Sequence, residues 1–384
     1  MSVPTSSKGQ YLHGPKTLNL EERPLPAPAS DEVQIAIRST TLCGSDVHYY
    51  TYNRNGSIEI KEPLCGGHEA AGVVVALGHG IQNSTPLRPG DKVAIESGVP
   101  CENCPKCKSG LYNVCPQLRF RSSGAPFPHF QGTLQEYVNH PARWCHKLPE
   151  PLSFDDGALL EPLSVCIHAT KRARMEKGQT SLVFGAGAVG LLSAAVAKIE
   201  YGSRVVIADI DSGRVGFAVS EGFADVGFTI MPKRGTTSEE KLGIAREVAE
   251  EIGKLSWPQG GQVGRLDVVL ECTGVETCVQ TSIYAADSAG KVVLIGMGTA
   301  NQLWPISELT GREIDIVSVW RYASCYPRAI GIMDAVARQG MLPDIRKLIT
   351  HRFKGLESVP NAYETAAQTK DAKSQLVIKT VVNL

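Results

Sequence analysis

The sequence has no excess of charge of either sign. Lysine and arginine together number 39, as do aspartate and glutamate, so the formal net charge at pH 7 is zero. A neutral chain offers no electrostatic argument for binding nucleic acid or an anionic membrane. Long hydrophobic runs are missing too, because no apolar segment approaches the roughly 20 residues that a transmembrane helix requires. We therefore expect no nucleic-acid partner and no membrane partner.

A secretion signal and a disulfide framework are also missing. The first residues, Met1–Gln10, are polar and lack the apolar segment of a signal peptide. The last residues, Val381–Leu384, match no address tag. The eleven cysteines are odd in number, which argues against a disulfide framework in a long chain of this kind. A cytoplasmic protein is expected.

The length and the change of pattern along the chain predict two domains. A chain of 384 residues exceeds one ordinary core, and 42% hydrophobic with 20% charged residues is typical of globular proteins. The first 150 residues are rich in glycine, proline and short β-branched runs, which predicts a β-rich domain. The clearest of these runs are Val33–Ile37, Gly72–Ala76 and Lys92–Ile95.

From about residue 160, short apolar strands alternate with helical segments. This alternation predicts a parallel sheet with helices on both faces, so the fold class is α/β. The expected strands are Ser181–Phe184, Arg204–Ala208, Leu266–Leu270, Lys291–Ile295 and Asp315–Val319, and the expected helices include Ala188–Ile199, Thr277–Ala286 and Arg328–Arg338. A last strand is expected at Gln375–Val381, and the polar stretch Lys233–Gly264 is mostly helical in pattern.

A dinucleotide-binding turn follows the first of these strands. Gly185 permits a tight turn, Gly187 lets the backbone approach a pyrophosphate, and Gly190 lets helix and strand pack closely. The next strand ends at Asp209, 24 residues after Gly185, and its carboxylate can accept hydrogen bonds from both ribose hydroxyls of NAD. Arg214 could instead bind the 2′-phosphate of NADP or lie along the adenosine. NAD is the favoured cofactor.

Four cysteines crowd into one short polar segment. Their spacing puts four thiolates on one loop, which can close a tetrahedral zinc shell with no position open for substrate. Four unconnected buried cysteines are a poor alternative, because Glu102, Lys106 and Lys108 lie among them. We predict a structural zinc site at Cys101, Cys104, Cys107 and Cys115.

A second possible metal site is spread over the chain. Cys43, the pair His68 and Glu69, and Glu161 are each weak signals alone. Together a cysteine, a histidine and carboxylates form a plausible open zinc shell with room for water or substrate.

These motifs together resemble the zinc-dependent medium-chain dehydrogenases, and within them the polyol branch of sorbitol, xylitol and arabinitol dehydrogenases. The resemblance covers nearly the whole chain. It rests on Cys43–Tyr49, Gly67–Glu69, the four-cysteine segment, Gly157–Ser164, Gly185–Gly190, Glu271–Gly274 and the pair Arg321-Tyr322. It implies a GroES-like catalytic domain at 1–160 and 322–384, with a zinc lobe at about 98–118, and a Rossmann domain with a doubly wound parallel sheet at 161–321.

The resemblance also implies the ligands of the catalytic zinc. Cys43 and His68 match ligand positions, Glu69 matches the third, and Glu161 lies at the edge of the shell or reaches the metal through water. The sequence does not rank the two glutamates. Because all four lobe cysteines are present, two zinc ions per subunit are expected. A departure from the family is Cys65-Gly66, where larger aliphatic residues are more common.

Further roles follow from the same resemblance. Ser45 and His48 match a relay that carries the substrate proton to solvent, and Glu161 offers a competing route through bound water. The residues expected to line the substrate pocket are Tyr49, Phe120, Glu161, Arg321 and Tyr322. Those expected to contact NAD are Gly185, Gly187, Ala188, Val189, Gly190, Asp209, Arg214, Thr273, Ile295 and Arg321.

The implied activity is the zinc- and NAD-dependent oxidation of a polyol to a ketose. D-sorbitol to D-fructose ranks first and xylitol to D-xylulose second, with L-arabinitol as the alternative. A homodimer or homotetramer is expected. A metal-free quinone or enoyl reductase would lack Cys43, His68 and Glu161, which are all present. A non-catalytic zinc- and NAD-binding sensor would show a broken catalytic shell, which the sequence does not.

Overall fold

The computed structural model describes residues 3–81 and 85–384, and it divides the chain into two compact units. The first unit consists of Met1–Glu161, Tyr326–Arg338 and Arg346–Leu384, and the second consists of Pro162–Cys325 and Gln339–Ile345. Residues 322–325 and Gln339–Ile345 thus lie with the second unit and Glu161 with the first, whereas we expected 322–384 in the first and 161–321 in the second.

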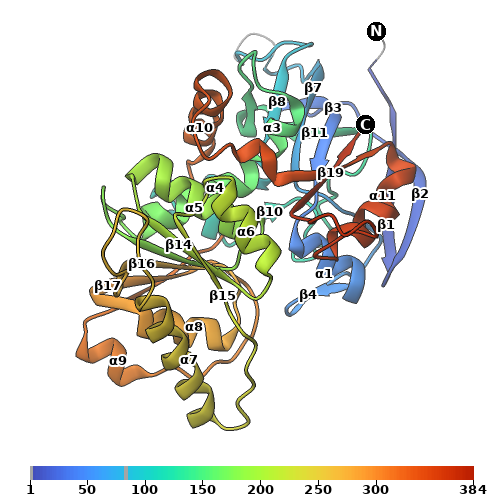
Figure 1. Ribbon diagram of the computed structural model, residues 1–384. Coiled ribbons are helices and arrows are strands. Elements are labelled where there is room, and N and C mark those ends of the chain that lie inside the picture. The colour runs from blue at the N-terminus through green and yellow to red at the C-terminus, as the bar shows by residue number, and fades with distance from the viewer. Residues whose placement is uncertain (1–2, 82–84) are drawn as a thin grey trace. The chain divides into compact units, whose positions relative to one another are not determined.

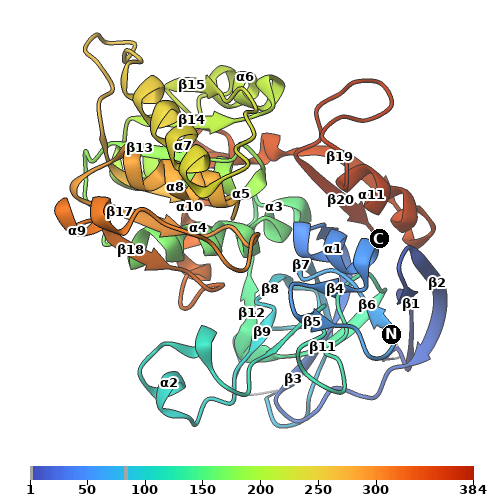
Figure 2. The same ribbon diagram turned by 90° about the horizontal axis from the view of Figure 1, so that it is seen from below.

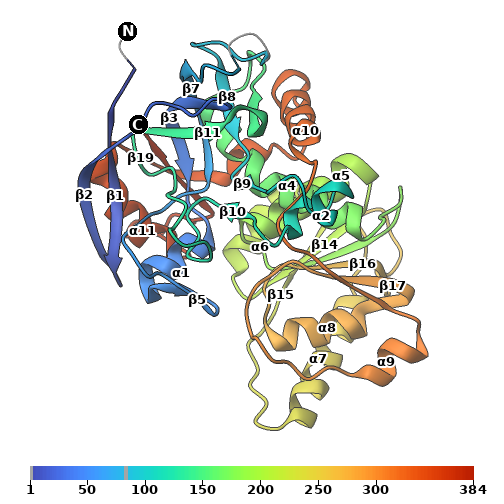
Figure 3. The same ribbon diagram turned by 180° about the vertical axis from the view of Figure 1, so that it is seen from behind.

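The first unit is built mainly from β-strands, as expected. Its largest sheet has seven strands in the order β12-β8-β7-β3-β20-β19, with β11 also paired to β3. Within this sheet only β19 and β20 run parallel to each other. A three-stranded sheet, β2-β1-β6, accompanies it, and Figure 3 shows β1 and β2 side by side.

The strands of the first unit are β1 (Ser6–Gly14), β2 (Thr17–Pro24), β3 (Glu32–Thr41), β4 (Arg54–Asn55), β5 (Ile58–Glu59), β6 (Leu64–Cys65), β7 (Glu69–Leu77), β8 (Lys92–Ile95), β9 (Gly98–Val99), β10 (Arg119–Phe120), β11 (Tyr137–Pro141), β12 (Cys145–Lys147), β19 (Ile349–Lys354) and β20 (Lys379–Asn383). Its helices are α1 (Gly44–Tyr52), α2 (Pro105–Lys108), α3 (Phe154–Ala158), α10 (Tyr326–Gln339) and α11 (Val359–Ala366).

The core of the large sheet explains why β3 lies at its centre. Val33, Ile35 and Ile37 alternate along β3 and are fully buried against apolar side chains of β7 and β8, including Val74 and Val93. Burial of both faces favours such β-branched residues. The order of the strands brings the end of β3, the start of β7 and β20 together, because Thr41 pairs with Glu69 across β3 and β7 and with Val381 across β3 and β20.

The second unit contains a six-stranded sheet in which all strands are parallel. The strand order is β15-β14-β13-β16-β17-β18, which is that of two mononucleotide-binding halves joined at β13 and β16. Figure 1 shows α5 and α6 on one face of this sheet and α7 and α8 on the other. The predicted α/β class with a doubly wound parallel sheet is confirmed.

The strands of the second unit are β13 (Ser181–Phe184), β14 (Val205–Asp209), β15 (Val226–Thr229), β16 (Leu266–Glu271), β17 (Ala286–Leu294) and β18 (Asp315–Ser318). Its helices are α4 (Leu160–Arg172), α5 (Ala188–Tyr201), α6 (Ser212–Ser220), α7 (Ser238–Gly253), α8 (Glu276–Ala285) and α9 (Ile306–Gly311).

One sequence expectation needs adjustment and another is confirmed. The last strand covers Lys379–Asn383 and begins later than predicted, because Leu376 makes only an isolated bridge with Lys370. The polar stretch after residue 232 contains α7, whose start carries a capping box between Thr237 and Glu240. Within residues 3–81 and 85–384, no helix combines the length and the apolar character needed to cross a membrane.

Candidate functional site

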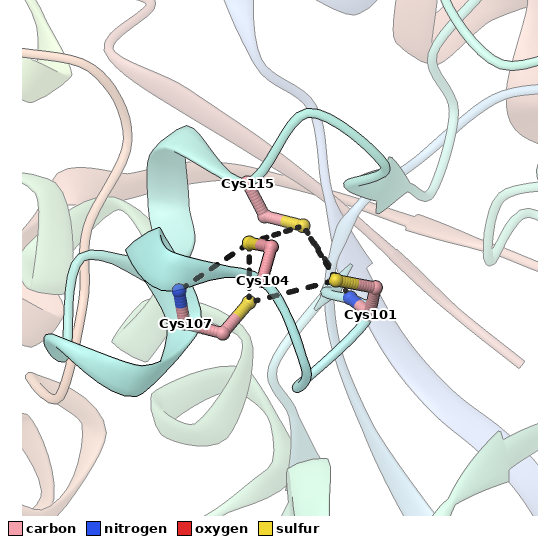
Figure 4. Close-up of side chains that lie close together, drawn as sticks. All are labelled: Cys101, Cys104, Cys107 and Cys115. Atoms are coloured by element: carbon pink, nitrogen blue, oxygen red, sulfur yellow. Dashed lines mark hydrogen bonds between the residues drawn. The ribbon is translucent and has the colours of Figure 1, made fainter.

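The four lobe cysteines bring their sulfur atoms together (Figure 4), and all four lie within 4.8 Å of one another. The Sγ–Sγ distances are 3.5 Å for Cys104–Cys107 and Cys101–Cys115, 3.8 Å for Cys104–Cys115 and 4.0 Å for Cys101–Cys107. A tetrahedral zinc with Zn–S bonds of about 2.3 Å places its sulfur atoms about 3.8 Å apart. The cluster therefore fits a zinc ion bound by four thiolates.

The local chain direction explains this convergence. Cys104 is the N-cap of α2, a proline opens the helix, and the Cys107 N–H donates to the Cys104 sulfur at 3.5 Å. The backbone N–H groups of Asn103 and Cys104 lower the pKa of the Cys101 thiol to about 6. Desolvation and the neighbouring sulfur atoms raise the pKa of Cys107 to about 12. Thiols this crowded resist losing all their protons unless a cation shares the site, and zinc supplies that charge.

A second cluster joins Cys43, His68 and Glu69, whose candidate ligand atoms lie within 4.8 Å of one another. Cys43 immediately precedes α1, His68 immediately precedes β7, and Glu69 is the first residue of β7. His68 and Glu69 are buried and Cys43 is partly exposed. One thiolate, one imidazole and one carboxylate make a three-ligand set that leaves a fourth position for water or substrate, which is the arrangement of catalytic zinc sites.

Glu161 is buried close to this cluster but is not one of the three residues that form it among those the structure describes. Its charge is near enough to help raise the pKa of Lys379. Its predicted place at the edge of the metal shell remains a prediction.

Asp46 lies at the centre of the contacts that hold this cluster, and the sequence analysis did not single it out. Its carboxylate accepts the backbone N–H of Cys43 at 3.0 Å and lies 3.2 Å from Nδ1 of His68. Burial would raise the pKa of Asp46, but His68 and its other hydrogen-bond donors lower it overall. The contact leaves the other ring nitrogen of His68 to bind a metal, and carboxylates orient metal-binding histidines in the same way in other zinc proteins. The available signal was Asp46 at the N3 position of α1, which forms a capping box with Cys43.

Lys379 on β20 is a second residue that the sequence analysis missed. Its Nζ lies 2.6 and 2.7 Å from the two carboxylate oxygens of Glu69, and both side chains are buried. Thr41 also donates its hydroxyl to Glu69. Burial would lower the pKa of Lys379, but Glu69 and the nearby Cys43 raise it. Glu69 is therefore paired with a buried cation and also accepts a hydroxyl hydrogen bond.

The residues predicted for proton transfer and substrate binding lie in different places. Ser45 is partly exposed and His48 is exposed, and they are three residues apart on α1, where side chains share one face. Tyr49 is buried and its hydroxyl accepts the Gly124 N–H at 3.2 Å, while the Phe120 ring lies 5.4 Å from the His68 ring. Their roles stay predictions.

Two further predicted substrate residues lie in the second unit. The Arg321 guanidinium lies 4.9 Å from the ring of Trp320, and the Arg321 backbone has a φ of 51°, in the left-handed region. Tyr322 is buried. The substrate roles assigned to both residues stay predictions.

The dinucleotide turn has the geometry that its glycines predict. Gly185 has a φ of +92°, which favours glycine, and a Cβ on Gly190 would lie 1.7 Å from the carbonyl oxygen of Gly185. Gly187 caps α5, and Ala188 and Val189 form its first turn, so their N–H groups face a phosphate site.

The acid at the end of β14 closes the same turn. The Asp209 carboxylate accepts the Ala186 N–H at 2.6 Å and the Asp211 N–H at 2.9 Å. Arg214 lies beside the dinucleotide turn, because its Nη1 is 3.8 Å from the position that a Cβ on Gly187 would take.

Two of the remaining predicted NAD contacts, Thr273 and Ile295, bond to Glu271 at the end of β16. Glu271 is fully buried, and burial raises its pKa. Thr273 donates both its N–H and its hydroxyl to the Glu271 carboxylate, and the Ile295 N–H donates to the Glu271 carbonyl at 2.9 Å. Glu271 thus orders the loops after β16 and β17, at the carboxyl edge of the sheet where nucleotides bind in this fold.

The departure at Cys65-Gly66 has a structural counterpart. A Cβ on Gly66 would lie 2.1 Å from the hydroxyl of Tyr363, which is buried in α11 and stacks on Tyr50 at 4.7 Å. The space beside Gly66 is thus filled by an aromatic ring from a distant segment. The absence of a side chain at Gly66 therefore makes room for the Tyr363 ring.

We expect Gly66→Ala to lower the free energy of unfolding by about 1–3 kcal/mol, because overpacking a buried site forces neighbours to shift. Urea unfolding measures the change. Gly14→Ala is the control, because no atom lies within 4 Å of a Cβ built there. Adding Tyr363→Phe to Gly66→Ala should restore part of the loss. Equal stability of Gly66→Ala and Gly14→Ala would contradict the packing described here.

Family comparisons agree with this combination of units and metal ligands. Residues 29–150 match the alcohol dehydrogenase GroES-like domain family, and residues 188–335 match the zinc-binding dehydrogenase family. The class defined by the fold and the site is that of zinc-dependent dehydrogenases.

Curated relatives narrow the class. The chain is 39% identical to sorbitol dehydrogenase of Gallus gallus over 365 residues, which cover 95% of this chain and 94% of the relative. It is 38% identical to sorbitol dehydrogenase of Homo sapiens over 355 residues, which cover 92% and 91%. The chain belongs to the sorbitol dehydrogenase branch of the zinc-dependent medium-chain dehydrogenases, and its cofactors are zinc and NAD.

Solved structures show the same fold. L-idonate 5-dehydrogenase from Escherichia coli matches with a TM-score of 0.82 and 25% identity, over 99% of this chain and 98% of that one. An alcohol dehydrogenase from E. coli CFT073, complexed with NADH, matches with a TM-score of 0.80 and 25% identity, over 99% of this chain and 100% of that one.

Proposed function

We propose that this chain oxidises a secondary hydroxyl of an open-chain polyol to a ketone, with D-sorbitol to D-fructose as the leading reaction and xylitol to D-xylulose as the second. The observation that carries the proposal is the three-ligand cluster of Cys43, His68 and Glu69. It occurs in a chain that resembles curated sorbitol dehydrogenases over more than nine-tenths of its length. L-arabinitol is the alternative substrate.

Each site residue has a proposed role. Cys43, His68 and Glu69 hold the catalytic zinc, Glu161 lies at the edge of its shell, and the four lobe cysteines hold a second zinc. When bound, zinc polarises the substrate hydroxyl and NAD accepts the hydride from the carbinol carbon. Asp46 fixes the orientation of His68, and Lys379 pairs with the side chain of Glu69.

The hydroxyl proton must leave the site during oxidation. We assign its exit to Ser45 and then His48, because one face of α1 carries both and exposure increases from the first to the second. A water held by Glu161 offers a second route. The two routes are separated by His48→Gln, which should slow polyol oxidation only if the proton leaves through His48.

Substrate contacts are proposed, from the family resemblance alone, for Tyr49, Phe120, Glu161, Arg321 and Tyr322. A site that hydrogen-bonds several hydroxyls discriminates strongly against analogues that lack them. Simple alcohols such as ethanol should therefore react poorly.

The proposal is tested by NAD reduction with zinc-loaded protein and a panel of sorbitol, xylitol, L-arabinitol, ribitol and ethanol, with bound zinc measured in the same sample. We expect turnover of one or more polyols, little turnover of ethanol, and about two zinc ions per chain, one for each ligand cluster. Absence of turnover with every polyol, despite two bound zinc ions, would overturn the proposed activity.

Asp209 is proposed to select NAD over NADP. We expect Asp209→Asn to raise the ratio of kcat/KM for NADP to that for NAD by about 10- to 100-fold, because a hydrogen bond to a charged group contributes about 1.5–3 kcal/mol and the repulsion of the 2′-phosphate also falls. Steady-state kinetics with both cofactors measure the ratio. Asp211→Asn is the control, since Asp211 caps α6 and asparagine caps equally well. An unchanged ratio in Asp209→Asn would remove the ribose role.

Domain roles, assembly and location complete the proposal. The GroES-like catalytic domain corresponds to the first unit and the Rossmann domain to the second. A homodimer or homotetramer is proposed from the family alone. We place the protein in the cytoplasm, because its eleven cysteines are free thiols and its thiolate ligands require a reducing compartment.

A further inference from the structure

The four-cysteine lobe leaves and rejoins the first unit at a short two-stranded ladder. β9 and β10 pair antiparallel, with Phe120 opposite Gly98, and the Arg121 N–H donates to the Ser97 carbonyl at 3.1 Å beyond them. Residues 98–118 are thus a loop that is closed at its base by this ladder. Figure 2 shows α2 in this loop, at a distance from the strands of the large sheet.

The outgoing side of the base holds His68 directly. Ser97 is fully buried and donates its hydroxyl to the backbone carbonyl of His68. On the returning side, the ring of Phe120 packs 5.4 Å from the ring of His68. Both sides of the lobe's base therefore contact the histidine of the three-ligand cluster.

The returning side also holds the aspartate behind the cluster. Ser122 is buried and donates its hydroxyl to Asp46 Oδ1 at 2.7 Å. The same oxygen lies 3.2 Å from Nδ1 of His68, and the other carboxylate oxygen accepts the Cys43 N–H at 3.0 Å. Through Asp46, Ser122 thus helps to position two of the three candidate ligands, His68 and Cys43.

A third contact joins the body of the lobe to the residue before Ser97. Tyr112, which lies between Cys107 and Cys115, donates its hydroxyl to Glu96 at 2.6 Å. Glu96 is buried, and its other carboxylate oxygen lies 2.7 Å from Nε2 of His146. A lobe that keeps its shape therefore fixes the chain on both sides of its base.

We propose that zinc in the lobe sets the affinity of the Cys43, His68 and Glu69 site for zinc, with Ser97 and Ser122 as the positioning residues. The inference rests on the proposed function, because it takes both clusters as zinc sites. Small four-thiolate lobes depend on metal for their fold, and outer-shell hydrogen bonds contribute about 10- to 100-fold to metal affinity. When the lobe loses zinc, its base loosens and the second site releases zinc more readily.

This coupling gives the lobe a function besides stability. Zinc depletion that empties the lobe also disables the reaction centre, although no lobe cysteine belongs to the three-ligand cluster.

The first test titrates the purified full chain with a competing zinc chelator and counts retained zinc by native mass spectrometry. Ser97→Ala and Ser122→Gly each remove one hydroxyl; glycine is used at Ser122 because its φ is 59°. We expect the dissociation constant of the Cys43 site to rise about 10- to 100-fold in each variant, with the lobe zinc retained. Ser109→Ala is the matched control, because that exposed lobe hydroxyl bonds only to the Lys106 carbonyl among the contacts described. It should leave both constants unchanged.

The second test empties the lobe itself. Cys104→Ser should lose the lobe zinc and weaken the remaining site by a similar factor, with a changed cobalt spectrum when Co²⁺ is loaded at Cys43 and His68. Should Cys104→Ser fail to fold, the Ser97→Ala and Ser122→Gly variants still test the coupling. Unchanged zinc affinity at the Cys43 site in both of these variants overturns the inference but leaves the proposed function standing. A wild-type chain that binds zinc only in the lobe overturns the proposed function and the inference together.

Discussion

Replacing Cys43 with serine is expected to lower kcat/KM for polyol oxidation by at least about a thousandfold. A metal ion contributes several kcal/mol of charge stabilisation in the transition state, and each 1.4 kcal/mol is about tenfold in rate. Serine is neutral near pH 7 and is a far weaker zinc ligand than a thiolate. The three-ligand cluster would lose its only sulfur.

Three measurements on Cys43→Ser separate loss of zinc from loss of fold. Bound zinc should fall from about two to about one per chain, which leaves the lobe filled. NAD binding, measured by calorimetry, should be retained, because the dinucleotide turn belongs to the second unit. Cys145→Ser serves as the control, since that buried thiol contacts the Pro141 carbonyl at 3.5 Å and belongs to neither cluster. Full activity in Cys43→Ser would remove the catalytic zinc assignment.

The second large effect is expected for Lys379→Met. The change leaves the Glu69 carboxylate buried without its cation, and breaking one side of a buried ion pair costs about 3–5 kcal/mol of stability. Urea unfolding of the zinc-free protein measures the loss. Adding Glu69→Gln to Lys379→Met should recover much of it, because the stranded charge is then removed. Lys233→Met, which breaks an exposed pair with Glu247, should leave stability nearly unchanged.

The Lys379→Met variant also tests whether Glu69 or Glu161 binds the catalytic zinc. If Glu69 binds zinc, the ion supplies the positive charge that Lys379→Met removes, so zinc should stabilise this variant more than the wild type. If Glu161 is the ligand instead, the extra stabilisation of this variant by zinc should be smaller, because the ion then makes no bond to the Glu69 carboxylate. Comparing unfolding with and without zinc therefore decides which carboxylate completes the three-ligand set.

Much of this protein was predictable because its chemistry lies in short segments. The short spacing of Cys101, Cys104 and Cys107 keeps their sulfur atoms close together on one loop. The glycines after β13 and the acid at the end of β14 are likewise set by local chain geometry. The alternation of strands and helices in the second unit predicted its parallel sheet for the same reason.

Other contacts lie beyond such reasoning because they join segments far apart in the sequence. Lys379 reaches Glu69 across 310 residues, and nothing in the local pattern of β20 distinguishes that lysine from an exposed one. Asp46 stood within a recognised motif, yet its function appears only when Ser122 and His68 are seen around its carboxylate.

The sequence alone determined the class of fold, and it predicted the lobe ligands, the dinucleotide turn and the candidate ligands of the second metal site without ranking Glu69 and Glu161. Each follows from short-range spacing or from a resemblance between motifs. Only the tertiary structure decided which side chains support those ligands, with Asp46 behind His68 and Lys379 against Glu69, and that Tyr363 packs beside Gly66. Such partners depend on how distant strands and helices pack, and a buried hydrogen bond between them leaves no periodic signal in either segment.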